Sequence, residues 1–275
     1  MTTTESSPAG ALPIDHLSMA DAVKAMWAGQ MEAISAIEPA LPDLARACAD
    51  MANRLANSKG RIIYAGAGTS IRIGVQDGVE LGPTFDWPED RLAYVIAGGP
   101  AALMRSAEGA EDDAEDAASQ VAALCFTPHD ILIGVAASGR TPFTISAIKA
   151  ARAAGALTIA IANNSGSPLA AAADIALTAT TGAELVIGST RMKAGTAQKA
   201  ILNLLSTGTM IRLGHVVDGE MVSMVISNEK LLLRGTRIVA KLAHCSMEAA
   251  ASALLSTGND IKAAIILAKG GDDAA

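Results

Sequence analysis

Apolar residues recur along the chain in five short continuous runs, at 61–65, 92–97, 130–136, 157–162 and 174–178. A segment of helical composition separates each run from the next. Continuous apolar runs of this length, alternating with helices, are typical of parallel strands that are buried on both faces. The pattern predicts an α/β fold with a doubly wound parallel five-stranded sheet flanked by helices.

Two regions outside this alternation have helical periodicity alone. The first, 17–58, is a helical lead-in that is interrupted near Pro39 and Pro42. From about residue 215 onward the strands are expected to cease and only two or three short helices to follow, with breaks at 244–246 and 258–260. We therefore divide the chain into a flexible tail, the lead-in, a sheet domain and a C-terminal helical region, at 1–16, 17–58, 59–214 and 215–270.

Composition and charge narrow the class of protein. Of the 275 residues, 51% are hydrophobic but only 3% are aromatic, which favours close-packed helices with small side chains over a β-sandwich. The net charge is −7 and the basic residues are scattered, so the basic patch of a nucleic-acid-binding protein is missing. No apolar run has the roughly 18 residues of a membrane span, and the N-terminus has no signal pattern. We expect a cytoplasmic protein that binds neither nucleic acid nor membrane.

Cysteine and histidine give no sign of a metal site. The four histidines have no metal-ligand spacing, so we predict no metal. The cysteines are odd in number, widely spaced and set in apolar contexts, which predicts reduced packing residues of a cytosolic protein. They are Cys48, Cys125 and Cys245.

Three loops carry the candidate chemistry, because ligands of an open parallel sheet bind at the carboxyl ends of its strands. The first loop, Gly66-Ala67-Gly68-Thr69-Ser70, follows the run at 61–65. Ile71 stands in place of the third glycine of the dinucleotide fingerprint, and the lysine of a Walker loop is absent. A small anion is therefore the better prediction for this loop.

The other two loops also precede predicted helices. In Ala137-Ser138-Gly139-Arg140-Thr141-Pro142, Thr141 as N-cap and Pro142 as the first helical residue predict a helix start whose N–H groups face a phosphate. The third loop is Gly188-Ser189-Thr190-Arg191-Met192-Lys193, ahead of another apolar helical pattern. We expect the three hydroxyl-rich helix starts to converge on one phosphate group.

Several long strings resemble one protein family. GAGTS at 66–70, ASGRTP at 137–142 and GSTRMKAGTAQK at 188–199 resemble the sugar-isomerase (SIS) fold, specifically its N-acetylmuramic acid 6-phosphate etherase family. IAGG at 96–99, EGAEDD at 108–113 and SNEKLLLRGTRIV at 227–239 agree with it. The resemblance implies an SIS domain at 59–214 and a homodimer in which both subunits line each site. It also implies β-elimination followed by water addition, without metal or organic cofactor, yielding N-acetylglucosamine 6-phosphate and D-lactate.

The resemblance also implies roles for single residues. Glu80 matches the proton donor of the family and Glu111 its second catalytic glutamate. For Glu111, which lies in an acidic run, the alternative is a solvated helix start. Ile71 departs from the family pattern, and its β-branched side chain is expected to narrow the phosphate loop. The expected phosphate-binding residues are Gly68, Thr69, Ser70, Ser138, Gly139, Arg140, Thr141, Ser189, Thr190 and Lys193.

Two other functions fit the same motifs. An aldose–ketose isomerase, or a lyase on a related phosphosugar, shares the first deprotonation at C2 but needs no acid above C3. A non-catalytic sugar-phosphate sensor needs neither glutamate. The requirement for Glu80 in lactate release discriminates among these alternatives.

Overall fold

Five parallel strands form the sheet of the computed structural model, in the order β2-β1-β3-β4-β5. The structure describes residues 4, 6, 12–105 and 107–270; the predicted tail lies mostly outside them. The central strands β1, β3 and β4 are buried at every position, as expected of a sheet covered on both faces. The α/β fold predicted from the apolar runs is confirmed. The strands are β1 Ile62–Gly66, β2 Leu92–Ile96, β3 Ile131–Ala136, β4 Leu157–Ala162 and β5 Ile175–Thr178.

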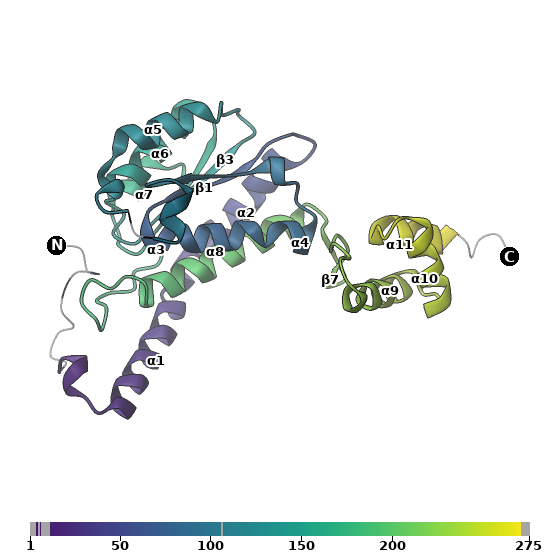
Figure 1. The fold of residues 1–275 in the computed structure, drawn as a ribbon, viewed down its shortest axis with the longest axis horizontal. Coiled ribbons are helices and arrows are strands. Elements are labelled where there is room, and N and C mark those ends of the chain that lie inside the picture. The colour runs from purple at the N-terminus through teal and green to yellow at the C-terminus, as the bar shows by residue number, and fades with distance from the viewer. Residues whose placement is uncertain (1–3, 5, 7–11, 106, 271–275) are drawn as a thin grey trace. The chain divides into compact units, whose positions relative to one another are not determined.

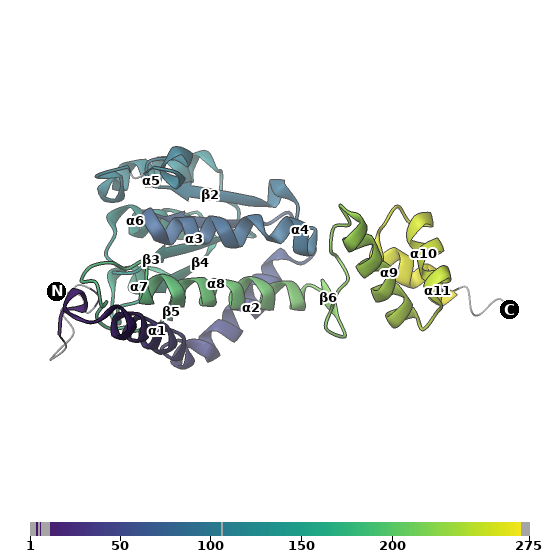
Figure 2. The same cartoon turned by 60° about the horizontal axis from the view of Figure 1, so that its bottom comes forward.

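Helices cover both faces of this sheet (Figures 1 and 2). The side chains of β1 alternate between the two faces of the sheet. Ile63 and Ala65 pack among the helices of one face, whereas the Tyr64 ring contacts a helix of the other. The first layer consists of α5 Ala114–Ala123, α6 Pro142–Ala153 and α7 Pro168–Ala172. The second consists of α2 Leu41–Leu55, α3 Gly68–Val79 and α8 Lys193–Arg212.

The helical lead-in has the predicted interruption. Helix α1, Met19–Ser35, begins after Ser18, whose side chain accepts a hydrogen bond from the Asp21 N–H group. A 3-10 turn at Glu38–Ala40 carries Pro39 and leads directly into α2, which has Pro42 near its start. Proline is tolerated in a first helical turn because the N–H group there has no intrahelical acceptor.

The chain divides into two compact units, one of residues 1–78 and 90–209, the other of residues 79–89 and 210–275. The second unit has its own apolar core, which includes Ile238, Leu254 and Ile261. Among the described residues, no single helix is long and apolar enough to cross a membrane; α9 and α10 pass that test together, with a bend of 110° between them. The helices of this unit are α4 Leu81–Phe85, α9 Glu229–Ala243, α10 Met247–Ser256 and α11 Ile261–Gly270.

A short hairpin in the second unit corrects one prediction. Strands β6, Val216–Val217, and β7, Glu220–Met221, pair antiparallel, so the expectation that strands cease near residue 215 is wrong. Asp218 and Gly219 join them, with φ angles of 47° and 78°. Asp-Gly between two strands is a strong signal for a two-residue hairpin turn, because both central residues need positive φ. The predicted breaks before α10 and α11 are confirmed.

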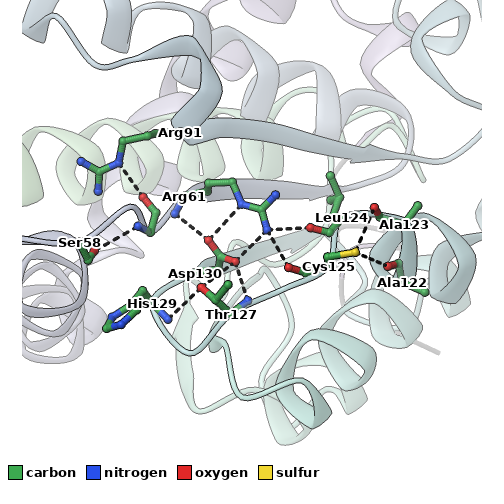
Figure 3. A network of polar contacts seen from close by, with 11 residues as sticks. Ser58, Arg61, Arg91, Ala122, Ala123, Leu124, Cys125, Thr127, His129 and Asp130 are labelled. Carbon is green, nitrogen blue, oxygen red and sulfur yellow. Dashed lines mark hydrogen bonds and ion pairs between the residues drawn. The ribbon is translucent and has the colours of Figure 1, made fainter.

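A partly buried ion pair between Arg61 and the buried Asp130 holds the amino ends of β1 and β3 together (Figure 3). The Asp130 carboxylate accepts hydrogen bonds from the Arg61 side chain, at 2.8 Å from Nη2 and 3.1 Å from Nε. It also accepts from the backbone N–H groups of Arg61 and Thr127, at 2.8 and 2.7 Å. Arg61 Nη2 donates in addition to the carbonyl of Leu124 at 2.8 Å. This network lies at the amino ends of the strands, whereas the candidate loops lie at their carboxyl ends.

The charges of this pair are mutually stabilised. Burial alone would raise the pKa of Asp130, but the hydrogen bonds from Arg61 and from the backbone outweigh it, and the pKa is lowered. The hydrogen bond to Asp130 in turn raises the pKa of Arg61. Both groups are therefore ionised at neutral pH, which makes the pair a stabilising feature of the fold.

The cysteines are only partly the packing residues that the sequence predicts. Cys48 is buried, which agrees with the prediction, and Cys245 is partly buried. Cys125 is exposed and has a φ angle of 48° in the loop after α5, so for this residue the prediction is wrong.

Candidate active site

The strand order places two of the three candidate loops side by side. In a doubly wound sheet of order 2-1-3-4-5, the ligand site lies where the strand order reverses, outside the carboxyl ends of β1 and β3. Gly66, the last residue of β1, pairs with Val135 of β3. The loop at Gly68 follows β1 and the loop at Ser138 follows β3, so both loops leave the sheet at this reversal point.

The first loop turns directly into helix α3. Gly68 has a φ angle of 54° and is the first residue of α3, and Ser70 lies in the first helical turn, 8% exposed. Ile71 is helical and only 1% exposed, so the left-handed position falls on Gly68 and the Ile71 side chain is inside the protein. The first N–H groups of a helix lack intrahelical acceptors and carry partial positive charge. The start of α3 can therefore hold an anion.

The second loop gives helix α6 a similar start. Thr141 is the N-cap of α6 and Pro142 its first residue, as predicted, and the Thr141 side chain makes no capping hydrogen bond. The Ser138 hydroxyl accepts a hydrogen bond from the Arg140 N–H group at 3.1 Å. The Arg140 side chain is exposed. This loop thus offers hydroxyls and helix N–H groups, in the chemistry that phosphate recognition requires.

Residues after β4 hold the second loop in place by hydrogen bonds and close packing. The Ala137 carbonyl accepts hydrogen bonds from the Asn163 N–H group at 3.0 Å and from the Asn164 side chain at 2.9 Å. Gly139 has a φ angle of 63°, and a Cβ atom there would lie 2.3 Å from the Ser167 hydroxyl. Only glycine fits this close approach.

The third loop reaches the first through helix packing. A Cβ atom on Gly195, in the first turn of α8, would lie 3.5 Å from the Thr190 carbonyl and 3.8 Å from the Thr69 methyl group. Helices α3 and α8 lie side by side (Figure 2). The Lys193 ammonium is 2.8 Å from the Glu32 carboxylate of α1, so in this structure its charge is paired within the chain. The role of Lys193 as a phosphate ligand stays a prediction.

A buried carboxylate fixes α3 in this arrangement. Asp77 is 6% exposed and accepts hydrogen bonds from the Tyr64 hydroxyl at 2.8 Å, the Asn203 amide at 2.7 Å and the Ser206 hydroxyl at 3.1 Å. Burial, together with the charge of Asp77, raises the pKa of Tyr94 to about 12. Strand β1 and helix α8 thus hold α3 at one position.

The two predicted catalytic glutamates lie on different parts of the chain. Glu80 directly follows the last residue of α3 and is exposed; it is the N-cap of α4 but makes no side-chain capping bond. It belongs to the second unit, whereas Ser70 belongs to the first. Within one chain, nine residues, all of them in α3, lie between Ser70 and Glu80 in sequence.

Glu111 is exposed in a 3-10 turn, Ala110–Asp112, before α5. The helix itself is capped by Asp113, whose carboxylate accepts from the Asp116 N–H group at 2.8 Å. A Cβ atom on Gly98, close after β2, would lie 3.3 Å from Ala110, so the turn lies near the carboxyl end of β2. The turn that contains Glu111 thus lies at the carboxyl ends of the strands, the same end of the sheet that carries the first two loops.

Three residues that organise these loops are not among those predicted from the sequence: Arg72, Asn164 and Glu184. Asn164 has a recognisable signal, because a polar residue just after a buried strand lies at the ligand edge of the sheet. Arg72 donates to the carbonyls of Ala102 and Leu103, at 2.9 Å each, and so joins α3 to the loop after β2. The Glu184 carboxylate accepts a hydrogen bond from the Lys193 N–H group at the start of α8, nine positions further along the chain, whereas a usual capping side chain reaches only two or three positions. Neither Arg72 nor Glu184 has a local sequence signal.

Comparisons with known proteins identify the fold and the family of the chain. Residues 43–152 match the glucokinase regulatory protein N-terminal SIS domain, and residues 108–208 match the SIS domain. The N-acetylmuramic acid 6-phosphate etherase of Symbiobacterium thermophilum is 46% identical over 96% of this chain and 87% of its own length. That of Streptomyces avermitilis is 45% identical over 98% of this chain and 87% of its own.

Solved structures share the fold at lower identity. A candidate phosphosugar isomerase involved in capsule formation from Bacteroides fragilis has a TM-score of 0.56 and 19% identity, covering 74% of this chain and 95% of its own. The NanR protein of Vibrio vulnificus, complexed with ManNAc-6P, has a TM-score of 0.53 and 15% identity, covering 71% and 65%. The fold is therefore the SIS fold, and the relatives above show that the chain belongs to the N-acetylmuramic acid 6-phosphate etherase family.

Proposed function

We propose that this protein is a carbon–oxygen lyase that cleaves the lactyl ether of N-acetylmuramic acid 6-phosphate during recycling of cell-wall sugars. The products are N-acetylglucosamine 6-phosphate and D-lactate. The observation that carries the proposal is the position of two helix starts, those of α3 and α6, directly after the neighbouring strands β1 and β3 at the reversal point of the sheet, in a chain of this family. Such a pair of N-termini suits a phosphate dianion.

The phosphate binds first in this scheme. The hydroxyls of Ser70, Ser138 and Thr141 and the N–H groups of the two helix starts hold its oxygens, and Ser189 and Thr190 complete the pocket from the loop before α8. These contacts are the same for substrate and product, so they fix the position of the sugar and contribute to affinity more than to the rate of bond cleavage.

The chemistry then needs one acid and one base. Once the sugar ring opens, the C2 proton lies beside the C1 aldehyde and a base removes it, the electron pair forms the C2–C3 double bond, and the C3–oxygen bond breaks. Glu80 protonates the departing lactate oxygen. Water then adds to C3 and a proton returns to C2, which restores a saturated sugar. Glu111 is the second carboxyl group of this sequence of proton transfers.

Release of D-lactate by the purified protein tests the proposal directly. An aldose–ketose isomerase would change the sugar without releasing lactate, and a sensor would bind the phosphosugar without turnover. Incubation with N-acetylmuramic acid 6-phosphate should therefore yield D-lactate and N-acetylglucosamine 6-phosphate in equal amounts. Binding without lactate would contradict the proposed function.

Ser138→Ala is expected to raise KM for the phosphosugar about tenfold and to change kcat less than about threefold, since its hydroxyl contacts a group that does not react. The measurement is steady-state lactate release. Ser119→Ala is the matched control, because Ser119 is exposed on α5. An unchanged KM in Ser138→Ala would remove this hydroxyl from the phosphate site.

We further propose that a second copy of the chain completes each site. Helix α3 has 12 residues and spans about 18 Å, which is longer than a hexose phosphate, so the Glu80 that acts on a given sugar comes from the partner. Helix α1 offers a surface for the partner, since its exposed apolar residues recur every third or fourth position on one face. These are Met19, Val23, Trp27, Met31 and Ile34.

Trp27→Glu is expected to convert the dimer to a monomer and to lower lactate release at least about tenfold, because a charge at the centre of an apolar interface opposes association. Light scattering after gel filtration measures the mass, and the activity assay is run at the same concentration. Ala28→Glu adds the same charge at an exposed position beside the apolar face and should leave both unchanged. A monomeric wild type with full activity would contradict the shared site.

The remaining expectations concern partners and location. The net charge of −7 favours a small-molecule partner over nucleic acid. None of the three cysteines, which all lie among the described residues, forms a disulfide, as is typical of a reducing compartment. We therefore place the enzyme in the cytoplasm.

A further inference from the structure

A fully buried carboxylate occupies the start of helix α8. Glu184 lies in the connection between β5 and α8 and is 0% exposed. Its two oxygens accept hydrogen bonds from consecutive backbone N–H groups, those of Lys193 and Ala194, at 3.0 Å each. Burial of a carboxylate is costly unless its oxygens are satisfied, and here two backbone donors and the positive end of a 20-residue helix satisfy them.

This contact closes the loop that carries Ser189 and Thr190. Inside the closed loop, the Ser189 N–H group donates to the Val186 carbonyl at 2.9 Å and the Thr190 N–H group to the Gly188 carbonyl at 3.0 Å. The Thr190 carbonyl accepts from Gly195 in the first turn of α8, at 2.9 Å. The backbone that presents the two hydroxyls is therefore fixed relative to α8.

The same contact removes α8 from the set of anion-binding helix starts. A free helix N-terminus attracts a phosphate, but at α8 two N–H groups already face a carboxylate of the chain. The Lys193 ammonium next to them is paired with Glu32 at 2.8 Å. Of the three predicted helix starts, only those of α3 and α6 remain for the phosphate of a substrate.

We propose that Glu184 is a positioning residue for the substrate. Its carboxylate takes the place of a bound anion at α8 and holds the loop so that the hydroxyls of Ser189 and Thr190 face the sugar phosphate. The helix N–H groups that bind the phosphate are then those of α3 and α6. This inference rests on the proposed function, because it assigns a role within the same site. It places Glu184 behind the loop, with no contact to the reacting atoms.

The test is chemical rescue of Glu184→Ala by formate, a small carboxylate that fits the space vacated by the side chain. The variant should raise KM for N-acetylmuramic acid 6-phosphate at least about tenfold and lower kcat less than about threefold. Excess formate should return KM toward the wild-type value and leave the wild type unchanged. Asp260→Ala is the matched control, since Asp260 caps α11 in the second unit by accepting from the Ala263 N–H group at 2.9 Å.

The outcomes separate this inference from the proposed function. A wild type that releases no lactate contradicts the proposed function, whereas an active wild type with an unchanged KM in Glu184→Ala overturns only the role of Glu184. Formate that restores the melting temperature but leaves KM raised also overturns it. If Glu184→Ala does not fold, Glu184→Gln, of equal volume, is compared in the same assay. Failure of both to fold, with and without formate, would make Glu184 a purely structural residue.

Discussion

Replacing Glu80 with glutamine is expected to lower kcat for lactate release about 10²- to 10⁴-fold, the range over which a positioned general acid contributes. Glutamine has the same shape but cannot give a proton to the departing lactate oxygen. KM should change less than about threefold, because the phosphate contacts come from other residues. The substitution should not disturb the fold, since the Glu80 side chain is exposed and makes no capping hydrogen bond at α4.

Steady-state kinetics of lactate release, with binding of the phosphosugar measured separately, checks this prediction. Glu89→Gln is the matched control, because Glu89 is an exposed glutamate in the same unit. Turnover by Glu80→Gln at the wild-type rate would remove Glu80 from the chemistry. Equal losses of binding and turnover would point to a structural role.

Replacing Asp130 with asparagine is expected to lower the free energy of unfolding by about 1–3 kcal/mol, the cost of leaving donors to a buried carboxylate unsatisfied, since the Arg61 side chain stays 21% exposed. The asparagine amide would direct N–H groups at donors that now face a carboxylate, those of Arg61 and Thr127. Chemical denaturation at neutral pH measures the difference. Arg46→Ala, which breaks the exposed pair with Asp43, should cost less than about 1 kcal/mol.

The pH dependence of this effect has a definite sign. The pKa of Asp130 is lower in the folded protein than the value of about 3.9 for an unfolded chain. The pair therefore stabilises the fold fully above that value, and the stabilisation is lost as the pH falls through the folded-state pKa. The difference between wild type and Asp130→Asn should shrink in acid. A difference that is the same at every pH would contradict the ionised pair.

Local patterns were sufficient to predict the sheet and two of the helix starts. Each buried strand is a continuous apolar run. Thr141 before Pro142 predicts an N-cap and a first helical residue, and these two residues do begin α6. The hairpin at Asp218-Gly219 had a local signal as well, and the apparent helical composition of the region concealed it.

Contacts between distant residues could not be predicted in this way. Lys193 looked like a free cation for phosphate, but its partner Glu32 is 161 positions away. Asp130 and Arg61 are 69 positions apart, and no periodicity indicates that they meet. Ion pairs of this kind depend on the order of the strands and the packing of helices, so they become visible only once the chain is folded.

Turnover of N-acetylmuramic acid 6-phosphate in water labelled with ¹⁸O and deuterium tests the central claim most directly. Elimination followed by hydration predicts ¹⁸O on C3 of the sugar, deuterium at C2, and D-lactate that keeps the unlabelled ether oxygen. Magnetic resonance and mass spectrometry of the two products locate both labels. ¹⁸O in the lactate, or a C2 position that retains its original hydrogen, would contradict cleavage through a C2–C3 double bond.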